Sequence, residues 1–386
     1  MIEGSSVIEG SKRWFWMATP PEVGKPYRHE AGTANVFAMI GASNLRRGVV
    51  AALLVCAASA SPAAAAVKGM WGPVSQFATY HRLGASIYEA DLPWASVAPV
   101  RPRRPQDPRD QAYRWPPGLD VAVAQARRYH MRVLLQVIGA PGWANGGHAW
   151  AWAPRRPRDF ADFTRAAALR YRSVHLWMIW GEPTRAGNFE PIVKAAPGVA
   201  LNRAQRSAPH IYARLLDVAY GELKAVSRHN LVIGGDTYTV GLIDTEQWIA
   251  NLKLPDGRPP RMDLYAHNPF GFREPSFSNP PSPFGDVDFS DLPRLTPLLD
   301  RYLRPGLRLF LSEFTIPTAP DNEFNAYVSE QTQALWISDA LRLSRAWKRI
   351  YALGWIHLSD DPPATTGGLL RSDGSPKPGF FAFARG

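Results

Sequence analysis

Apolar strand-like runs alternate with amphipathic helical stretches along most of this 386-residue chain. From Val67 onward, eight mainly apolar runs are separated by seven stretches in which apolar residues recur at helical spacing. The apolar runs lack the strict alternation of apolar and polar residues that marks a strand with one solvated face. Strands of a parallel sheet that is covered by helices on both faces have this continuous apolar character. The pattern therefore predicts an α/β fold around a buried parallel sheet.

Eight such units in about 320 residues fit a single (β/α)8 TIM barrel with enlarged loops. The alternative is a doubly wound open sheet, but no G-x-G-x-x-G motif follows the first run. Two proline-rich stretches, 99–117 and 279–293, read as long loops and not as linkers between domains. We therefore predict one (β/α)8 domain over residues 67–386.

The stretch NLRRGVVAALLVCAASASPAAAAVKG has the features of a secretory signal peptide. Arg46 and Arg47 form its charged region, residues 48–60 form its apolar region, and an A-x-A cleavage pattern ends at Ala66. The apolar region is too short for a comfortable membrane span. A buried Ala-rich helix is the alternative interpretation, but the cleavage pattern favours the signal. We expect a secreted or cell-envelope protein that is cleaved near Ala66 and has no membrane span once processed.

Residues 39–66 form the expected signal peptide, which opens at Met39. Residues 1–38 precede it and are interpreted as an over-long translation start or a leader. The only cysteine of the chain, Cys56, lies within the signal peptide. Cleavage would therefore leave a chain without disulfides, thiolate metal ligands or a cysteine nucleophile.

The net charge of +11 comes mostly from arginine, which is scattered along the sequence and not gathered into one basic block. Nucleic-acid binding usually requires a concentrated basic patch or stripe, so we expect no nucleic-acid partner. Aromatic residues make up 11% of the chain, including 14 Trp. This content suits a carbohydrate-binding surface, although it also suits a large core.

Two glutamates lie at the carboxyl ends of predicted barrel strands. In this fold the chemistry lies at the carboxyl ends of the strands. Glu182 ends the fourth run, and Glu313 ends the seventh. Two carboxyl groups about 5–5.5 Å apart are the pair that hydrolyses a glycosidic bond with retention of configuration. The alternative for either residue is a salt bridge to a neighbouring arginine.

Several stretches carry a resemblance to a known group of enzymes. They are WGEP and SEFT around the two glutamates, together with DLPWASVAPVRP, APGWAN, YAHNPFG, GWIHLSDD and GLLRSDGSPKPGFFAF. From about Met70 to Phe383, the chain resembles the cellulase-like clan of retaining (β/α)8 glycoside hydrolases, in particular bacterial secreted or envelope members. The resemblance implies Glu182 as the acid/base and Glu313 as the nucleophile. It also implies a carbohydrate substrate and a reaction that needs no metal and no cofactor.

Six further residues near strand ends are expected to bind substrate: Trp94, Trp143, Trp180, His267, Asn268 and Trp355. The resemblance implies that Trp355 is a platform for a sugar ring and that His267 bonds near the nucleophile. The alternatives are a core tryptophan and a satisfied buried imidazole. Trp94 and Trp143 are expected either to line the cleft or to pack within loops.

Four other positions bear on activity. Asp91 and Asp236 are expected either to polarise substrate hydroxyls or to pair with arginine. Gly181 stands where the clan has an Asn that bonds the sugar 2-hydroxyl, and Glu89 stands where many relatives carry Arg. These two departures leave a second hypothesis, a glycan-binding barrel of the cell envelope without turnover, and a third, a structural envelope protein. The paired glutamates favour the enzyme.

Overall fold

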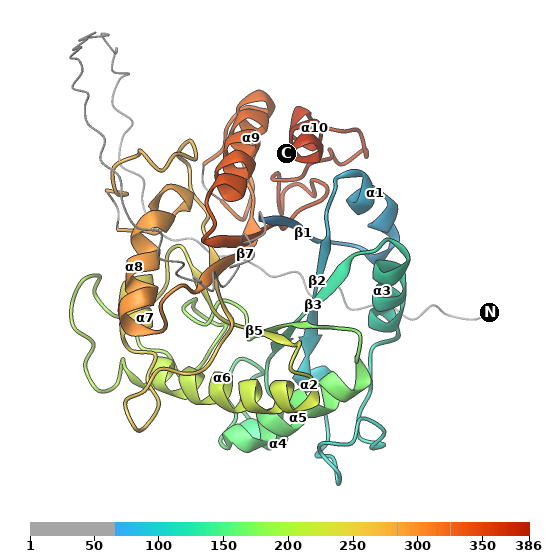
Figure 1. Cartoon of the computed structure of the whole chain (residues 1–386), viewed down its shortest axis with the longest axis vertical. Helices are drawn as coiled ribbons and strands as arrows, with labels where there is room; N and C mark the ends of the chain where they lie inside the picture. Colours follow the sequence, from blue (N-terminus) through green and yellow to red (C-terminus); the bar gives the residue numbers. More distant parts are fainter. Residues whose placement is uncertain (1–65, 284, 325) are drawn as a thin grey trace, which may run out of the picture. The chain divides into compact units, whose positions relative to one another are not determined.

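Eight parallel strands form a closed barrel in the computed structural model, which describes residues 66–283, 285–324 and 326–386 (Figure 1). Each strand pairs in parallel with the next along the chain, and β1 closes the barrel against β8. The predicted (β/α)8 fold is confirmed. The strands are β1 Val67–Trp71, β2 Ile87–Pro93, β3 Arg132–Ile138, β4 Leu176–Ile179, β5 Leu231–Tyr238, β6 Leu264–Asn268, β7 Arg308–Phe314 and β8 Ile350–Trp355.

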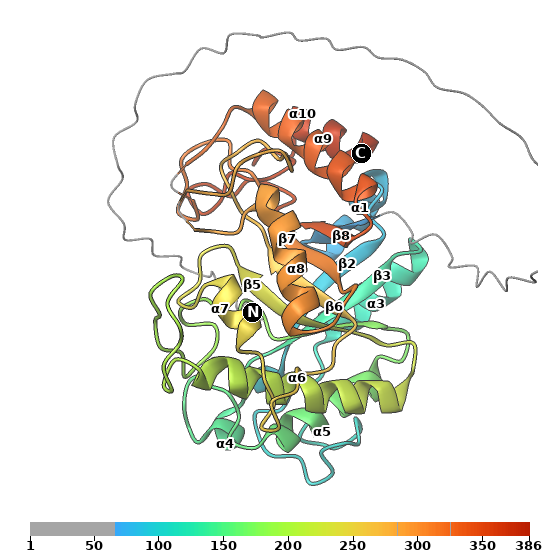
Figure 2. The ribbon, with the colours of Figure 1, turned by 60° about the vertical axis from the view of Figure 1, so that its left-hand side comes forward.

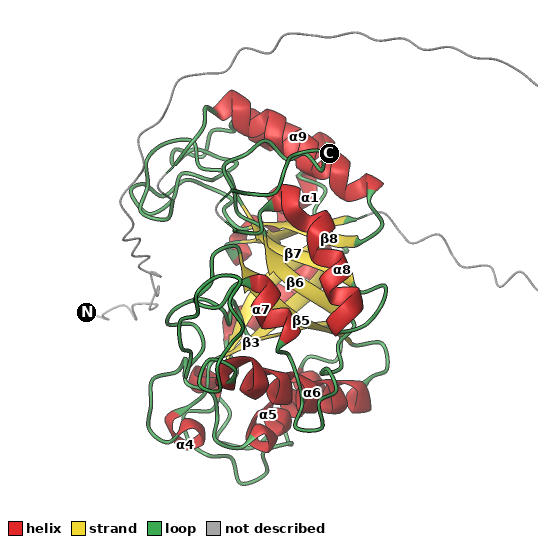
Figure 3. Ribbon diagram, turned by 90° about the vertical axis from the view of Figure 1, so that its left-hand side faces the viewer, coloured by secondary structure: helices red, strands yellow, loops and turns green. Residues whose placement is uncertain are grey.

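Helices surround the strands (Figures 2 and 3). They are α1 Phe77–Arg82, α2 Trp94–Val97, α3 Pro117–Arg128, α4 Gly142–Asn145, α5 Pro157–Arg170, α6 Ser207–Val226, α7 Thr245–Ala250, α8 Leu292–Tyr302, α9 Glu330–Ala346 and α10 Pro378–Arg385. Among the described residues, no helix is long and apolar enough to cross a bilayer. The predicted leader, 1–38, and signal peptide, 39–66, lie outside the described residues except for Ala66.

Local sequence signals explain where several helices begin. Pro117 and Pro157 occupy the first turns of α3 and α5, where the missing N–H of proline costs nothing. Asp244 and Gln247 form a capping box at α7, in which each side chain accepts a hydrogen bond from the backbone N–H of the other. Ser329 caps α9 by accepting a hydrogen bond from the backbone N–H of Thr332.

The barrel interior changes from apolar to polar along the strands. Nine buried side chains from the strands form a separate apolar cluster: Ile87, Leu134, Leu176, Met178, Ile233, Leu264, Ala266, Phe310 and Ala352. Positions two residues apart on a strand share a face. The next inward positions therefore include Glu89, Gln136, Asn268 and Ser312, four polar residues that are buried. This polar layer lies toward the carboxyl ends, beneath the predicted site.

Candidate active site

Asn268 connects the two predicted catalytic residues. Its Nδ2 donates to Oε1 of Glu182 at 3.2 Å, and its Oδ1 accepts from the backbone N–H of Glu313 at 3.0 Å. All three residues are buried, with Glu182 3% and Glu313 4% exposed. Asn268 is 45 positions from Glu313 in sequence, and the pairing of β6 with β7 brings these two residues together. It is 86 positions from Glu182, and the closure of the barrel brings this pair together.

The Glu182 carboxylate accepts from two more side chains. Arg185 Nη1 lies 2.9 Å from Oε2, and Asn188 Nδ2 lies 3.3 Å from the same oxygen. Sequence reasoning missed both residues, although they lie within six positions of Glu182 in the loop after β4. Every side-chain partner of Glu182 is a donor, and one of them is a cation, an arrangement that suits a charged carboxylate.

The backbone around Glu182 is held in an unusual conformation. Trp180 has φ of 65°, Glu182 has φ of 44°, and Asp236 on β5 has φ of 48°. Such left-handed conformations are costly for residues other than glycine and persist only where the surrounding structure enforces them. Asp236 Oδ2 accepts from the Glu182 N–H at 3.0 Å, and the register of β5 and β6 shifts between Gly235 and Thr237. Asp236 therefore positions Glu182 through its backbone.

Aromatic residues stand beside this carboxylate. The Arg185 guanidinium lies 5.0 Å from the ring centre of Tyr238, which packs against Phe270. Burial, and then the charge of Glu182, raises the pKa of the Tyr238 hydroxyl above its ordinary value. Phe324 completes the cluster, at 5.2 Å from Phe270 between ring centres. A sugar ring needs such apolar surface next to polar groups, and these residues were not predicted to supply it.

Three of the four predicted tryptophans are instead part of the core. Trp94 stacks on Phe163, and Trp180 donates its Nε1–H to the Asn188 carbonyl at 2.6 Å. Trp355 donates to the Gly367 carbonyl at 3.2 Å, and each of the three indoles is at most 1% exposed. For Trp355 the structure therefore favours the core alternative, and Trp94 and Trp180 are buried in the same way.

Trp143 is half-buried. It donates its Nε1–H to the Ala98 carbonyl at 2.8 Å, and Arg101 covers its ring at 5.1 Å from the centre. This placement favours loop packing over a cleft-lining role. Asp91, the other aspartate considered from the sequence, is exposed at the end of β2.

His267 bonds to the protein through both ring nitrogens. Its Nδ1 bonds to the Thr237 hydroxyl at 2.8 Å, and its Nε2 bonds to the Val287 carbonyl at 2.9 Å. Burial lowers the pKa of the imidazole to about 4, so the ring is neutral at pH 7. Because both nitrogens have protein partners, the satisfied buried imidazole describes this position better than a substrate contact does.

Glu89 is a fully buried acid beneath the site. Its Oε2 accepts from the Ser312 hydroxyl at 2.8 Å, whereas its Oε1 has no hydrogen-bond partner among the described residues. Burial, and then the nearby charge of Asp236, raises the pKa of Glu89 well above its ordinary value. Gly69 and Gly354 make room for it, since a Cβ at either position would lie within 2.5 Å of Oε1.

We expect Glu89→Gln to stabilise the protein above about pH 4.5, by an amount that grows as the pH rises. A raised folded-state pKa means that folded Glu89 keeps a proton which the unfolded chain loses above about pH 4.5, so stability falls as pH rises from there. Gln removes this loss. Thermal denaturation should show a Tm a few degrees higher than that of the wild type at pH 8 and unchanged at pH 4. A lower Tm at pH 8 would contradict the buried neutral acid.

Gln136 fills the space beside Gly181. A Cβ built at position 181 would lie 2.4 Å from Gln136 Oε1 and 2.9 Å from its Cδ. Gln136 is buried, and its Nε2 donates to Asp236 Oδ2 at 3.4 Å. The Gln136 carboxamide from β3 therefore occupies the volume that a side chain at position 181 would fill.

Within the described part of the chain, no group of three or more His, Cys, Asp or Glu side chains is placed to hold a metal ion. The site chemistry available on these residues is that of two buried carboxyl groups, amide donors and one guanidinium.

Solved structures of glycoside hydrolases have the same fold. A family 39 glycoside hydrolase from Bacteroides cellulosilyticus aligns with a TM-score of 0.57 and 18% identity over 82% of this chain. The chain spans only 62% of that protein's length. A monomeric β-xylosidase from Caulobacter crescentus aligns with a TM-score of 0.54 and 19% identity over 83% of this chain and 67% of its own. Xylanase B from Clostridium stercorarium gives 0.52 and 14% over 83% and 97%. The fold is that of these glycoside hydrolases. At such identities the likeness shows the fold alone, and neither a protein-family model nor a curated protein matches the chain.

Proposed function

We propose that the chain is a retaining glycoside hydrolase, with Glu182 as the acid/base and Glu313 as the nucleophile. One observation carries the proposal: the Asn268 side chain bonds the Glu182 carboxylate and the Glu313 backbone at the same time. This amide links the carboxylate of one glutamate to the backbone of the other, which supports the proposal that the two residues act at one site. Double displacement requires two carboxyl groups about 5–5.5 Å apart.

The proposed cycle uses only these groups. A proton on Glu182 passes to the glycosidic oxygen while a Glu313 oxygen attacks the anomeric carbon, so that the leaving sugar departs as an alcohol. Glu182 then takes a proton from water, whose oxygen replaces Glu313 at the anomeric carbon. The carboxyl group must accept that first proton beside Arg185, so the ion pair at 2.9 Å has to loosen when substrate binds.

To test the proposal, the chain from Val67 onward is incubated with a panel of aryl glycosides and of envelope or plant polysaccharides, and hydrolysis of each compound is measured. We expect release of the aryl alcohol from at least one glycoside, and NMR should show a first-formed sugar with retained anomeric configuration. Inversion would contradict the role of Glu313 as nucleophile. Absence of turnover on the whole panel, together with measurable glycan binding, would support the second candidate.

The second candidate is a glycan-binding barrel of the cell envelope without turnover. The observation that favours it is the full engagement of Glu182, whose carboxylate is bonded by Arg185, Asn188 and Asn268. Two buried carboxyl groups are costly to maintain in a protein that only binds. The enzyme therefore remains the first proposal, and its localisation in the secreted or envelope fraction is proposed with it.

We expect Gly181→Asn to lower kcat/KM at least about tenfold, because overpacking costs about 1–3 kcal/mol and here displaces Gln136 or Glu182. The clash begins at Cβ, so Gly181→Ala should lose a comparable amount. Both variants should lose activity equally on a matched pair of 2-hydroxy and 2-deoxy aryl glycosides.

Combining Gly181→Asn with Gln136→Ala should remove the clash. Recovery should then be larger on the 2-hydroxy substrate, because the new amide can bond the 2-hydroxyl in the transition state. A gain in activity from Gly181→Asn alone would show that Gln136 does not obstruct this position.

A further inference from the structure

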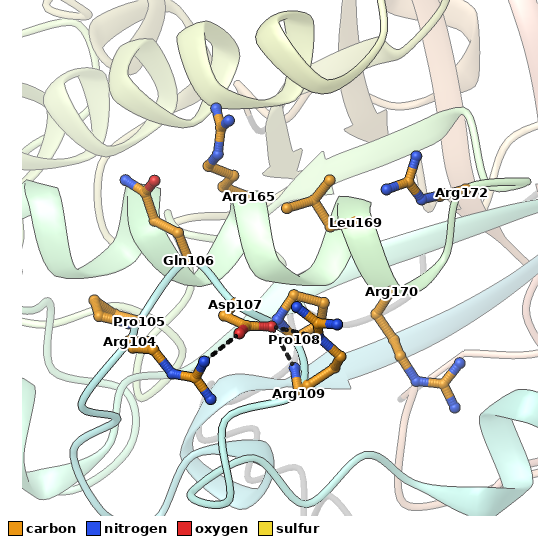
Figure 4. A pocket seen from close by; sticks show the side chains of 10 residues that line it. All are labelled: Arg104, Pro105, Gln106, Asp107, Pro108, Arg109, Arg165, Leu169, Arg170 and Arg172. Atoms are coloured by element: carbon orange, nitrogen blue, oxygen red, sulfur yellow. Dashed lines mark hydrogen bonds and ion pairs between the residues drawn. The ribbon is translucent and has the colours of Figure 1, made fainter.

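Five arginines line a surface groove on the outside of the barrel (Figure 4). The groove has a volume of about 1040 Å³ and lies between the loop 99–117, which follows β2, and the carboxyl-terminal half of α5 with the residues after it. The arginines are Arg104, Arg109, Arg165, Arg170 and Arg172. Asp107 is the only acidic residue in the lining, which gives the groove a strongly positive wall.

Ion pairs leave much of this charge uncompensated. Asp107 is shared between Arg104 at 3.1 Å and Arg109 at 3.2 Å, as the dashed lines in Figure 4 show. Arg172 is exposed and makes no ion pair with any described residue. Arg165 and Arg170 bond to acids outside the lining.

The two segments that build the groove concentrate the charge of the whole protein. Residues 99–117 and 154–173 hold eleven Arg and four Asp, with no Lys and no Glu. They therefore carry seven of the eleven net positive charges of the chain. Although the arginines are scattered in sequence, the fold places both segments on the same flank of the barrel.

The groove is separate from the carboxylate site. Arg170 and Arg172 precede β4, whereas Glu182 follows it. The groove lining shares no residue with the carboxylate site, because it is formed by the loop after β2 and by the end of α5 with the residues that follow. A polymer long enough to pass along the outside of the barrel is the kind of ligand that such a groove holds at a distance from the site.

We propose that this groove binds an anionic polysaccharide, through carboxylate or sulfate groups spaced along the polymer. The planar fork of arginine donates two parallel hydrogen bonds to such groups, and its charge persists at every physiological pH. Single-stranded nucleic acids need aromatic side chains on which bases stack. The lining contains no aromatic residue on which a base could stack, so a single-stranded nucleic acid is disfavoured. The anionic groups of the polysaccharide, and not its sugar rings, would make the contacts with the arginines.

Binding of two anionic polymers to the chain from Val67 onward tests the proposal. Heparin presents sulfate, polygalacturonate presents carboxylate, and neutral dextran serves as the blank. We expect both anionic polymers to bind at 50 mM NaCl, with affinity falling at 150 mM because bound counterions are released. The variant Arg104→Gln/Arg109→Gln/Arg172→Gln should weaken binding at least tenfold and reduce its salt dependence.

A control variant removes the same charge elsewhere. Arg258, Arg294 and Arg342 are exposed, and each makes one ion pair with an aspartate, as Arg104 and Arg109 do. The triple change of these control residues to Gln should alter affinity less than threefold. Changing Arg104, Arg109 and Arg172 to Lys keeps the positive charge but removes the two parallel donors of each guanidinium. This variant should bind with an affinity between those of the wild type and of the Gln variant.

Two results would overturn the proposal. One is an equal loss of binding in the groove and control variants, which would indicate net charge without a site. The other is tighter binding of a DNA duplex than of either polysaccharide at 150 mM NaCl, which would indicate nucleic-acid docking. Neither triple variant should change aryl-glycoside hydrolysis, so the result is independent of the proposed catalytic function.

Discussion

Glu313→Gln is expected to abolish hydrolysis of every glycoside that the wild type cleaves, by about 10⁴-fold or more. An amide oxygen is too poor a nucleophile to form the glycosyl intermediate, and loss of a nucleophile removes the catalytic pathway as a unit. The substitution is nearly isosteric, and the backbone N–H of residue 313 keeps its bond to Asn268. Steady-state kinetics and the Tm should therefore show a folded, inactive protein.

Glu323→Gln is the matched control for this experiment. Glu323 is also a buried glutamate, at 6% exposure, and its Oε2 lies 2.7 Å from His357 Nε2. It is placed outside the Asn268 bridge, so its loss should lower kcat/KM much less than the loss of Glu313. If Glu323→Gln is inactive while Glu313→Gln retains turnover, the nucleophile has been misassigned.

Glu182→Ala should spare one class of substrate. An activated aryl group such as 2,4-dinitrophenolate leaves without protonation, so kcat for its first step should fall less than about tenfold. Glycosides with a poor leaving group should lose about 10²–10⁴-fold, the usual contribution of general acid catalysis. Added azide should restore turnover of the activated substrate and give a glycosyl azide of retained configuration.

A second substitution, at Arg185, makes the azide experiment more specific. In the wild type, the Arg185 guanidinium lies beside Tyr238 and 2.9 Å from the Glu182 carboxylate. When Glu182 is replaced by Ala, this ion pair is lost, and we expect the guanidinium to attract the azide anion instead. The double variant Glu182→Ala/Arg185→Gln should therefore need a higher azide concentration for the same rescue. Equal losses on activated and unactivated substrates, with no response to azide, would show that Glu182 is not the acid/base.

The barrel was predictable because its signal is repeated eight times along the chain. Each unit pairs a continuous apolar run with an amphipathic stretch, and only a closed parallel sheet covered by helices buries all of them. Strand ends follow directly from this pattern. The placement of Glu182 and Glu313 at one mouth was therefore available from the sequence, and the shared contact with Asn268 supports it.

The direction in which a strand-end side chain points was not available. A shift of one residue in a strand moves a side chain from the barrel interior to the helix layer. Trp355 and His267 lie at strand ends, yet both are buried and bond to backbone carbonyls of the protein. Gln136 emerged as the neighbour of Gly181 only in the structure, since the register of β3 against β4 pairs Gln136 with Met178 and Gly181 lies beyond the end of β4.

The sequence by itself determined the fold class and the positions of the two glutamates, because the period of the apolar residues and the points where each run ends are local properties. Only the tertiary structure decided which polar groups meet. Asn268 reaches both Glu182 and the Glu313 backbone because the barrel is closed and gathers β4, β6 and β7 around one interior. Five arginines from 99–117 and 154–173 line one groove because the loop after β2 lies against α5. Such contacts depend on barrel closure and loop packing, and no local pattern of residues encodes them.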